Sequence, residues 1–384
     1  MNRVSFLIIL LLMFIFSAKV KAGQSIYDKE PSGVIFSPFN LEFSSMDKLL
    51  LINFEEGSDQ IYSGLEPQII DGKLRIIAWR NDGFVDVYQQ PSMLSVDNLD
   101  VAGKGLANFL ERDMEDFKFE INSKGVDLYF SFEDKKGREV EARIKEKGDK
   151  VIKPFDLLAP VGGSSENPSY LPLYFLYDFY FVRRAGTESI IKIAGKKQEV
   201  ENLPFFLDWS RCYFTRYSSD PFLVEWNADY EGSLSPLGPR TDGEVWDEDV
   251  RYSIRENNGY YEIEGMSISQ GEHQLRIDFS PAIPDIIALK DGVIISGKFL
   301  VSTSREKAGS ISGDYQIDRV GEEVLIEINP SGGWKPKISK WELRFIYFFG
   351  SDFFKDWPKP YNWTARINLE GDQVTMNSKW EIKE

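Results

Sequence analysis

Asp178 is the single charged residue in the stretch 170–181, YLPLYFLYDFYF, which has seven aromatic rings in twelve residues. A buried carboxyl group without a partner has a raised pKa and can donate a proton, whereas one beside a guanidinium stays ionised and structural. Asp178 is therefore a candidate general acid or one half of a buried ion pair, and the sequence leaves both open. The arginines expected nearest to it lie on the same or the following strands: Arg183, Arg184, Arg211 and Arg216.

The stretch reads as an extended strand, in which side chains alternate between two faces. One face is apolar apart from one phenol and belongs in a core; it carries Leu171, Leu173, Phe175, Tyr177, Phe179 and Phe181. The other face combines Tyr174, Asp178 and Tyr180 with apolar residues, and lacks the water-loving side chains of an ordinary outer face. We therefore expect both faces to be covered. Another domain or a bound amphipathic small molecule would serve, because tyrosine suits surfaces that are both apolar and hydrogen-bonding.

The aromatic character continues in the segment 203–226, where RCYFTRY alternates like a strand. Ser218, Ser219, Asp220 and Pro221 form a predicted turn, after which FLVEW returns with Trp226 on the core side. This hairpin and the first strand are the expected walls of a pocket. The predicted ligand-binding residues are Tyr174, Asp178, Tyr180, Arg211, Tyr213, Arg216 and Trp226.

The chain has one histidine and one cysteine, which limits its possible chemistry. A zinc site of the usual His/Cys type cannot be built from them, and a Ser-His-acid triad would have to use His273. We expect His273 to be a solvent-facing turn residue and Cys212 a small core residue. No glycine-rich phosphate loop with its lysine is present. The sequence therefore predicts no metal site and no cofactor.

Short alternating runs separated by turn residues dominate the rest of the chain, which predicts antiparallel hairpins. One segment, 96–114, has apolar residues near helical spacing, and we expect one short helix there and few others. The predicted fold is all-β, with two antiparallel barrels or barrel-like sandwiches. The hairpins are predicted for KLRIIAW with FVDVYQQ, DFKFEI with VDLYFSFE, VDLYFSFE with REVEARIK, YYEIEGMSI with HQLRIDF, DYQIDR with EVLIEIN, and WTARINL with QVTMNSKWEIK.

The first 22 residues have the layout of a secretory signal: a basic start at Arg3, an apolar run over 4–16 and small or short residues near a cleavage site. We therefore expect an exported protein with no transmembrane segment once the signal is removed. Loss of Arg3, Lys19 and Lys21 would change the formal charge from −16 to −19. Such an acidic protein as a whole is repelled by nucleic-acid phosphates and by anionic lipid head groups, so a nucleic-acid partner is not expected. The oligomeric state is left open.

A stretch rich in Gly, Ser and Pro, residues 233–244, predicts a linker between domains over 23–232 and 245–384. This layout resembles the two-barrel, lipocalin-like superfamily that includes carotenoid hydratases. The resemblance rests on the strand count, the two unequal halves, the aromatic strand before a hairpin at 188–194, and the order Gly195, spacer, Trp209, aromatic hairpin. Those relatives commonly show Gly, Trp, Asp and His close together, but here Lys196, Lys197 and Gln198 follow Gly195. The resemblance thus implies a fold and an apolar ligand, and no catalytic residue.

We expect an exported protein that binds an apolar or amphipathic small molecule in a barrel or between barrels. Two alternatives remain open at this point. One is an enzyme on the same scaffold, a hydratase, isomerase or cyclase of an isoprenoid-like substrate, with Asp178 as the proton donor and tyrosines steadying cationic intermediates. The other is a carbohydrate-binding or carbohydrate-processing β-sandwich, whose paired carboxylates would come from Asp178, Asp208, Glu225 and Glu231.

Overall fold

The computed structural model describes residues 25–93, 103–114, 116–148, 153–159, 166–240, 244–337, 341–349, 356–371 and 373–383. The predicted signal segment lies outside these residues. Within them the fold is all-β, as predicted: three large sheets, one α-helix, α2 (Glu342–Phe349), and one 3-10 turn, η2 (Glu306–Ala308). None of the described helices has both the length and the apolar character to cross a membrane.

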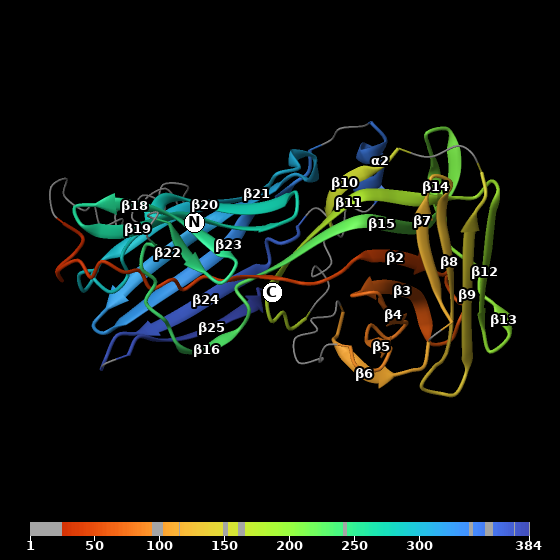
Figure 1. Cartoon of the computed structure of the whole chain (residues 1–384), viewed down its shortest axis with the longest axis horizontal. Coiled ribbons are helices and arrows are strands. Elements are labelled where there is room, and N and C mark those ends of the chain that lie inside the picture. The colour runs from red at the N-terminus through yellow and green to blue at the C-terminus, as the bar shows by residue number, and fades with distance from the viewer. Residues whose placement is uncertain are drawn as a thin grey trace, which may run out of the picture.

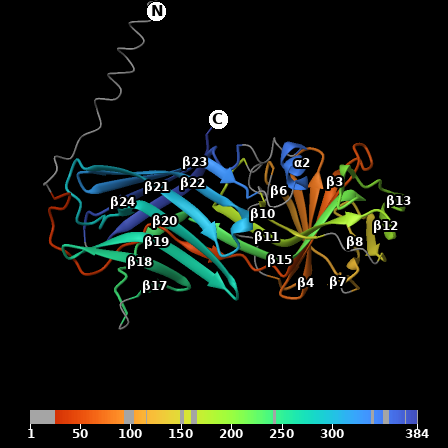
Figure 2. The ribbon, with the colours of Figure 1, turned by 90° about the horizontal axis from the view of Figure 1, so that it is seen from above.

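The first sheet has ten strands and is antiparallel except for one pair. Its main path runs β10-β11-β15-β2-β3-β4-β5-β6, and β1 and β14 both pair with β15. The strand direction turns strongly across this sheet, so that β3 and β4 run across the long strands β11 and β15 in Figure 2. Its strands are β1 (Leu41–Phe43), β2 (Lys48–Asn53), β3 (Tyr62–Ile70), β4 (Lys73–Arg80), β5 (Val85–Gln89), β6 (Leu106–Glu111), β10 (Phe155–Ala159), β11 (Leu171–Arg183), β14 (Asn202–Leu207) and β15 (Ser210–Trp226).

The second sheet has five strands and packs against one face of the first. The core between them contains alternate residues of both sheets, such as Leu65, Ile76 and Tyr217 from the first and Leu128 and Ile144 from the second. Together the two sheets form a sandwich at one end of the molecule (Figure 1). The strands of the second sheet, in spatial order, are β13 (Lys196–Lys197), β12 (Thr187–Ile193), β9 (Glu139–Glu146), β8 (Gly125–Glu133) and β7 (Lys118–Asn122).

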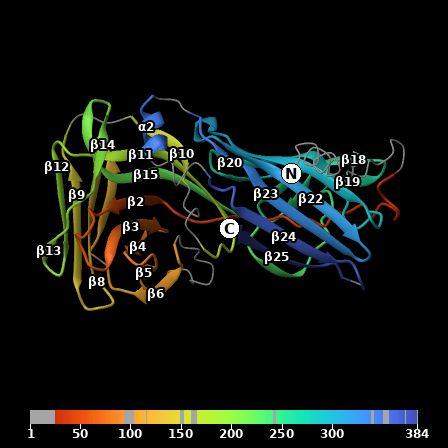
Figure 3. The same cartoon turned by 180° about the vertical axis from the view of Figure 1, so that it is seen from behind.

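The third sheet has ten strands and forms the other end of the molecule. Strands β17 to β25 form an antiparallel meander, and β16 pairs with β25 at its edge. Its inner residues share one core with the face of β11 that carries Phe175 and Tyr177, so the long strands β11 and β15 connect the two ends (Figures 1 and 3). The strands are β16 (Tyr230–Ser233), β17 (Val245–Asp247), β18 (Val250–Asn257), β19 (Tyr260–Gln270), β20 (His273–Ile283), β21 (Ile294–Thr303), β22 (Ser310–Val320), β23 (Glu323–Lys335), β24 (Tyr361–Asn368) and β25 (Thr375–Ile382).

All six predicted hairpins form, with β4–β5, β7–β8, β8–β9, β19–β20, β22–β23 and β24–β25 paired antiparallel. The aromatic stretch is β11, as expected. Its predicted core face is buried throughout, and Tyr180 and Val182 on the opposite face contact the sandwich core. Cys212 is a buried free thiol, and burial raises its pKa to about 12.

The predicted helix over 96–114 is wrong in its described part. Residues 106–111 form β6, which pairs in parallel with β5, and residues 94–102 lie outside the described structure. Two glycines with positive φ, Gly103 and Gly105, precede the strand. Phe109 and Leu110 then contact different apolar clusters on opposite faces, which is the period of a strand.

The predicted turn at 218–221 is also wrong, because β15 runs without a break from Ser210 to Trp226. A proline inside a strand is tolerated where its missing N–H removes no ladder hydrogen bond. Pro221 meets this condition, since on the side away from β11 it falls between the ladder to β2, which ends at Ser218, and the ladder to β1, which begins at Val224.

The N-terminal residues lie along the third sheet before the chain enters the first (Figure 1). Tyr27 forms a bridge with Leu289, and the Tyr252 hydroxyl donates to the backbone oxygen of Phe39 at 2.8 Å. Ile35 pairs with Leu237, which belongs to the predicted linker. The two ends of the molecule are therefore joined by the N-terminal segment as well as by β11 and β15.

Candidate functional site

The first sheet has a second face, turned away from the sandwich core, which is buried although it carries polar residues. Leu65 and Ile69 on β3 and Leu74 and Ile76 on β4 contact the sandwich core, so their strand neighbours point the other way. We call the polar residues gathered on this face the inner polar cluster. It comprises Glu66 and Gln68 on β3, Arg75 on β4, Gln89 on β5 and Arg216 on β15. Tyr170, just before β11, and Tyr174, within it, are not on this face by strand alternation, but both lie near enough to Arg75 to influence its pKa.

Arg75 is the most unusual member, because it is a guanidinium only 9% exposed. Its Nε and Nη2 donate to Oε1 of Gln89 at 3.2 and 3.1 Å. In the described part of the chain no carboxylate lies within 4 Å of it, so it forms no ion pair. Burial lowers its pKa, and the neighbouring Tyr174 and Tyr170 oppose that shift.

The two tyrosines show how strongly the sheet bends. Their hydroxyls lie 3.1 Å apart on the first residues of β11, whereas Arg75 is on β4. Three strands, β15, β2 and β3, separate β11 from β4, which in a flat sheet would correspond to roughly 19 Å. The influence of both tyrosines on the pKa of Arg75 accords with the strong turn of strand direction across this sheet (Figure 2).

Arg216 and Glu66 form the second part of the inner polar cluster. Arg216 donates to Oδ1 of Asn53 at 2.6 Å and to the backbone oxygen of Phe214 at 2.9 Å, and burial lowers its pKa to about 10. Burial raises the pKa of Glu66, while the hydrogen bond from Gln68 (2.8 Å) and the charge of Arg216 act in the opposite direction. The two charges influence one another without touching, since the described salt bridges include neither residue.

Gln68 has an unsatisfied hydrogen-bond acceptor. It is 4% exposed, its Nε2 donates to Glu66, and its Oε1 is buried without a hydrogen-bond partner among the described residues. Other buried polar atoms of the described residues share this feature, such as Oε1 of Gln198 and Oδ1 of Asn362. An ordered water or a bound molecule would satisfy such an acceptor. Apolar residues continue the same face along β4 and β5, where Ile77, Val85 and Val87 form a small cluster with Trp79 and Phe109.

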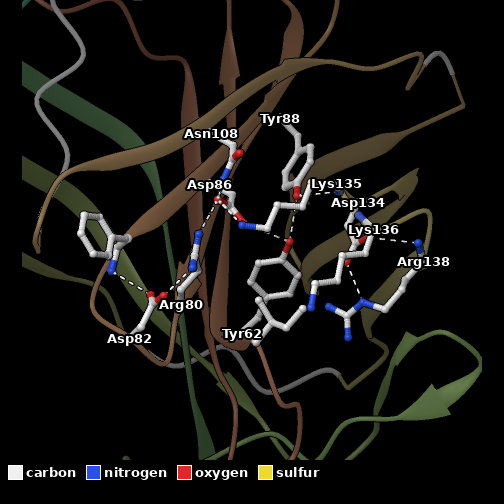
Figure 4. Close-up of polar contacts among 12 residues, drawn as sticks. Tyr62, Arg80, Asp82, Asp86, Tyr88, Asn108, Asp134, Lys135, Lys136 and Arg138 are labelled. Atoms are coloured by element: carbon white, nitrogen blue, oxygen red, sulfur yellow. Dashed lines mark hydrogen bonds and ion pairs between the residues drawn. The ribbon is translucent and has the colours of Figure 1, made fainter.

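Several other buried charges of the protein are paired, as the network at the far edge of the sandwich shows (Figure 4). Asp86, on β5 but facing the other way, contacts Arg80 at 3.3 Å and Lys135 at 3.0 Å and accepts from Asn108 at 2.6 Å. Asp134 binds Arg138 at 2.7 Å. We interpret this network as structural, because it ties the turn after β8 to the first sheet. The charged members of the inner polar cluster form no such pairs among the described residues, and burial of an uncompensated charge is costly.

The structure separates the predicted ligand-binding residues. Arg216 belongs to the inner polar cluster, and Tyr174 lies near one of its members, Arg75. Tyr180 stacks on Tyr217, with ring centroids 5.2 Å apart, in the sandwich core. Trp226 is fully buried between the first and third sheets, where it contacts Phe299 and Trp380.

The two remaining predicted residues of β15, Tyr213 and Arg211, lie away from the inner polar cluster and each forms a cation–ring contact. The guanidinium carbon of Arg184 lies over the ring of Tyr213, 5.6 Å from the ring centroid. Arg211 is exposed and lies over the ring of Phe206.

Asp178 occupies a bulge of β11 with φ of 47°, and its partner differs from every arginine expected. Its carboxylate is 3.9 Å from Arg305, whose guanidinium also lies 3.0 Å from Asp220 and 3.7 Å from Asp156. Arg183 instead pairs with Glu146. At 40% exposure and beside a cation, Asp178 is not the buried, unpaired acid that the acid-catalysis alternative requires.

His273 is part of the same junction, and its predicted exposure to solvent is wrong. Its Nε2 lies 2.8 Å from Oδ1 of Asp220, and its ring packs on Tyr177 at 4.6 Å. His273 and Arg305 come from the third sheet or the loop that follows β21, whereas Asp178 and Asp220 come from the first. This junction therefore fastens the two ends of the molecule together. The described residues contain no group of three or more His, Cys, Asp or Glu placed to hold a metal ion.

Four members of the inner polar cluster, Glu66, Gln68, Arg75 and Gln89, were not predicted from the sequence. Each alternates with an apolar neighbour in its strand and so looks like an ordinary outward-facing residue. Only the curvature of the sheet reveals that their face is covered.

Comparison of the chain with models of protein families, with curated proteins and with solved structures finds no match.

Proposed function

We propose that the protein is exported and binds a small amphipathic molecule on the concave face of its first sheet. The observation that carries this proposal is the presence of three buried ionisable groups, Glu66, Arg75 and Arg216, with no ion pair to one another or to other described residues. Burial of an uncompensated charge is costly, and ligand groups are a common means of compensation.

The chemistry of the cluster favours an anionic head group. Arg75 offers a planar fork of donors, and the hydroxyls of Tyr170 and Tyr174 are near enough to influence its pKa, which is a suitable setting for a carboxylate. The raised pKa of Glu66 reduces the negative charge that would oppose such a head group. The apolar side chains of Ile77, Val85 and Val87 offer a surface for an aliphatic tail.

Binding is tested by calorimetric titration with dodecanoate and, as a probe of equal chain length and opposite charge, dodecyltrimethylammonium. We expect the wild type to bind dodecanoate more tightly than the cation. Arg75→Met should weaken dodecanoate binding by about 10- to 100-fold, because a charge-assisted hydrogen bond contributes roughly 1.5–3 kcal/mol. Arg276→Met, at an exposed residue of β20 that pairs with Asp278, is the matched control and should leave the affinity unchanged.

The stability of the ligand-free Arg75→Met variant separates a binding role from a structural one. If Arg75 serves a ligand, methionine removes a buried, unpaired charge, and the melting temperature should stay the same or rise. A large loss of stability would show that Arg75 is structural. Equal dodecanoate affinity in the wild type and this variant, or no binding by either, would reject the proposal.

A further inference from the structure

Five large aromatic side chains project into solvent from two neighbouring segments, and we call them the aromatic patch. Trp209 is 92% exposed and Phe348 is 73% exposed, and the other three are exposed to lesser extents. Monomeric proteins seldom leave several large aromatic rings uncovered in one place, and such patches mark interaction sites. The aromatic patch comprises Phe206 and Trp209 from β14 and the turn that follows it, and Trp341, Phe345 and Phe348 from α2 and the residue before it.

Ring contacts connect the two segments. Phe205, next to Phe206 on β14, lies 5.8 Å from Phe345 of α2, and Phe345 lies 5.4 Å from Trp341. In Figures 1 and 3, α2 lies along the edge of the first sheet, above β10 and β11. The spacing 341, 345 and 348 places three rings on one side of the helix. Leu343 and Ile346 are buried on its other side.

Trp209 stands at the tip of a two-residue turn in which it and Asp208 both have positive φ (63° and 43°). Turns of this type strongly favour Asn-Gly or Asp-Gly, because a bulky side chain is strained there. No aromatic contact is recorded for its ring in the described part of the chain, and almost all of its surface is open to water. The fold therefore accepts backbone strain at Trp209, although the indole is almost fully exposed and adds nothing to the buried core.

The charges around the aromatic patch differ from those of the whole chain. Lys153, Arg211 and Arg344 are exposed at its rim, and the Arg211 guanidinium lies 5.5 Å from the ring of Phe206. Of the nearby acids, Asp208 accepts a hydrogen bond from the Lys153 backbone and Glu342 is buried. A locally basic rim on a chain of formal charge −16 is complementary to an anionic partner.

We propose that the aromatic patch docks the protein onto an anionic lipid bilayer, with its rings at the head-group level and Lys153, Arg211 and Arg344 facing the lipid phosphates. Tryptophan and phenylalanine beside arginine and lysine are the side chains that interfacial segments use. Each cationic side chain near an anionic surface strengthens binding. This docking does not depend on the proposed ligand site, although a bilayer would be a ready source of an amphipathic molecule.

Vesicle sedimentation with the full chain tests the docking. The vesicles are phosphatidylcholine alone or phosphatidylcholine with phosphatidylglycerol. We expect binding to the anionic vesicles, and an increase in apparent dissociation constant of at least about tenfold for the double variant Trp209→Ser/Phe348→Ser. The double variant Ile294→Ser/Val320→Ser removes exposed apolar side chains from the third sheet and should bind like the wild type. All variants share one N-terminus, so any contribution from it cancels.

Charge is tested separately with Arg211→Glu/Arg344→Glu, which should reduce binding to anionic vesicles and have little effect on vesicles of phosphatidylcholine alone. Quenching of tryptophan fluorescence by brominated lipid should be smaller in Trp209→Ser than in the wild type, which locates the contact. Equal binding of the wild type and Trp209→Ser/Phe348→Ser would overturn the proposal. A dimer, seen by light scattering, that this variant dissociates would also overturn it, because the patch would then be an interface between copies.

Discussion

Replacement of Arg183 by alanine is expected to lower the free energy of unfolding by about 3–5 kcal/mol. Arg183 and Glu146 are an ion pair at 3.2 Å, with side chains 6% and 2% exposed, that links β11 of the first sheet to β9 of the second. The Arg183 Nη2 also donates to the backbone oxygens of Lys124 and Gly148 at 2.7 and 3.1 Å. Alanine would leave the Glu146 carboxylate charged and buried without its cation.

Chemical denaturation followed by fluorescence measures this effect, and the same substitution at Arg276, whose ion pair is exposed, is the control. The control should lose about 1 kcal/mol or less. A loss below about 1 kcal/mol at neutral pH would show that the pair does not hold the two sheets together.

Replacement of Trp226 by alanine is expected to cost about 3–5 kcal/mol of stability and to leave dodecanoate binding unchanged. Its indole is fully buried, with Phe299 at 5.1 Å and Trp380 at 5.9 Å between ring centroids. Trp380 also donates from Nε1 to the backbone oxygen of Trp226 at 3.1 Å. Alanine would open a cavity in the core shared by the first and third sheets.

Denaturation and titration of the same preparation check both halves of this expectation. Trp209→Ala, which removes an exposed tryptophan, is the control and should change stability by less than about 0.5 kcal/mol. Weakened dodecanoate binding by a folded Trp226→Ala protein would place Trp226 at the ligand site after all. Unchanged stability would mean that the core around it can close.

The hairpins and the central aromatic strand were predictable from the sequence because they depend on local signals. Turn residues with positive φ, such as Gly83 and Gly137, end runs whose period is two. The predicted core face of β11 is buried throughout, whereas the opposite face is only partly covered, with the Asp178 side chain 40% exposed. The two wrong elements also have local causes. Pro221 looked like a turn residue, and its position between two ladders depends on which strands pair. Residues 106–111 had near-helical spacing but pair with β5.

The candidate site was only partly predictable, because it depends on curvature and on partners distant in the chain. Tyr174 and Arg216 were identified because the segments that carry them are unusually rich in aromatic residues. Arg75 was not, since KLRIIAW has the alternation of any half-exposed strand. The partner of Asp178 was missed because Arg305 lies 127 positions further along the chain, on a sheet whose contact with β11 no local pattern encodes.

Native mass spectrometry tests most directly whether the buried, unpaired charges of the first sheet form a ligand site. The purified protein is incubated with dodecanoate, sprayed under non-denaturing conditions and compared with Arg75→Met and Arg276→Met. We predict one added dodecanoate, or a co-purified amphiphile that dodecanoate displaces, in the wild type and Arg276→Met, with reduced occupancy in Arg75→Met. Only the bare chain mass in the wild type, or equal occupancy in all three proteins, would contradict the account.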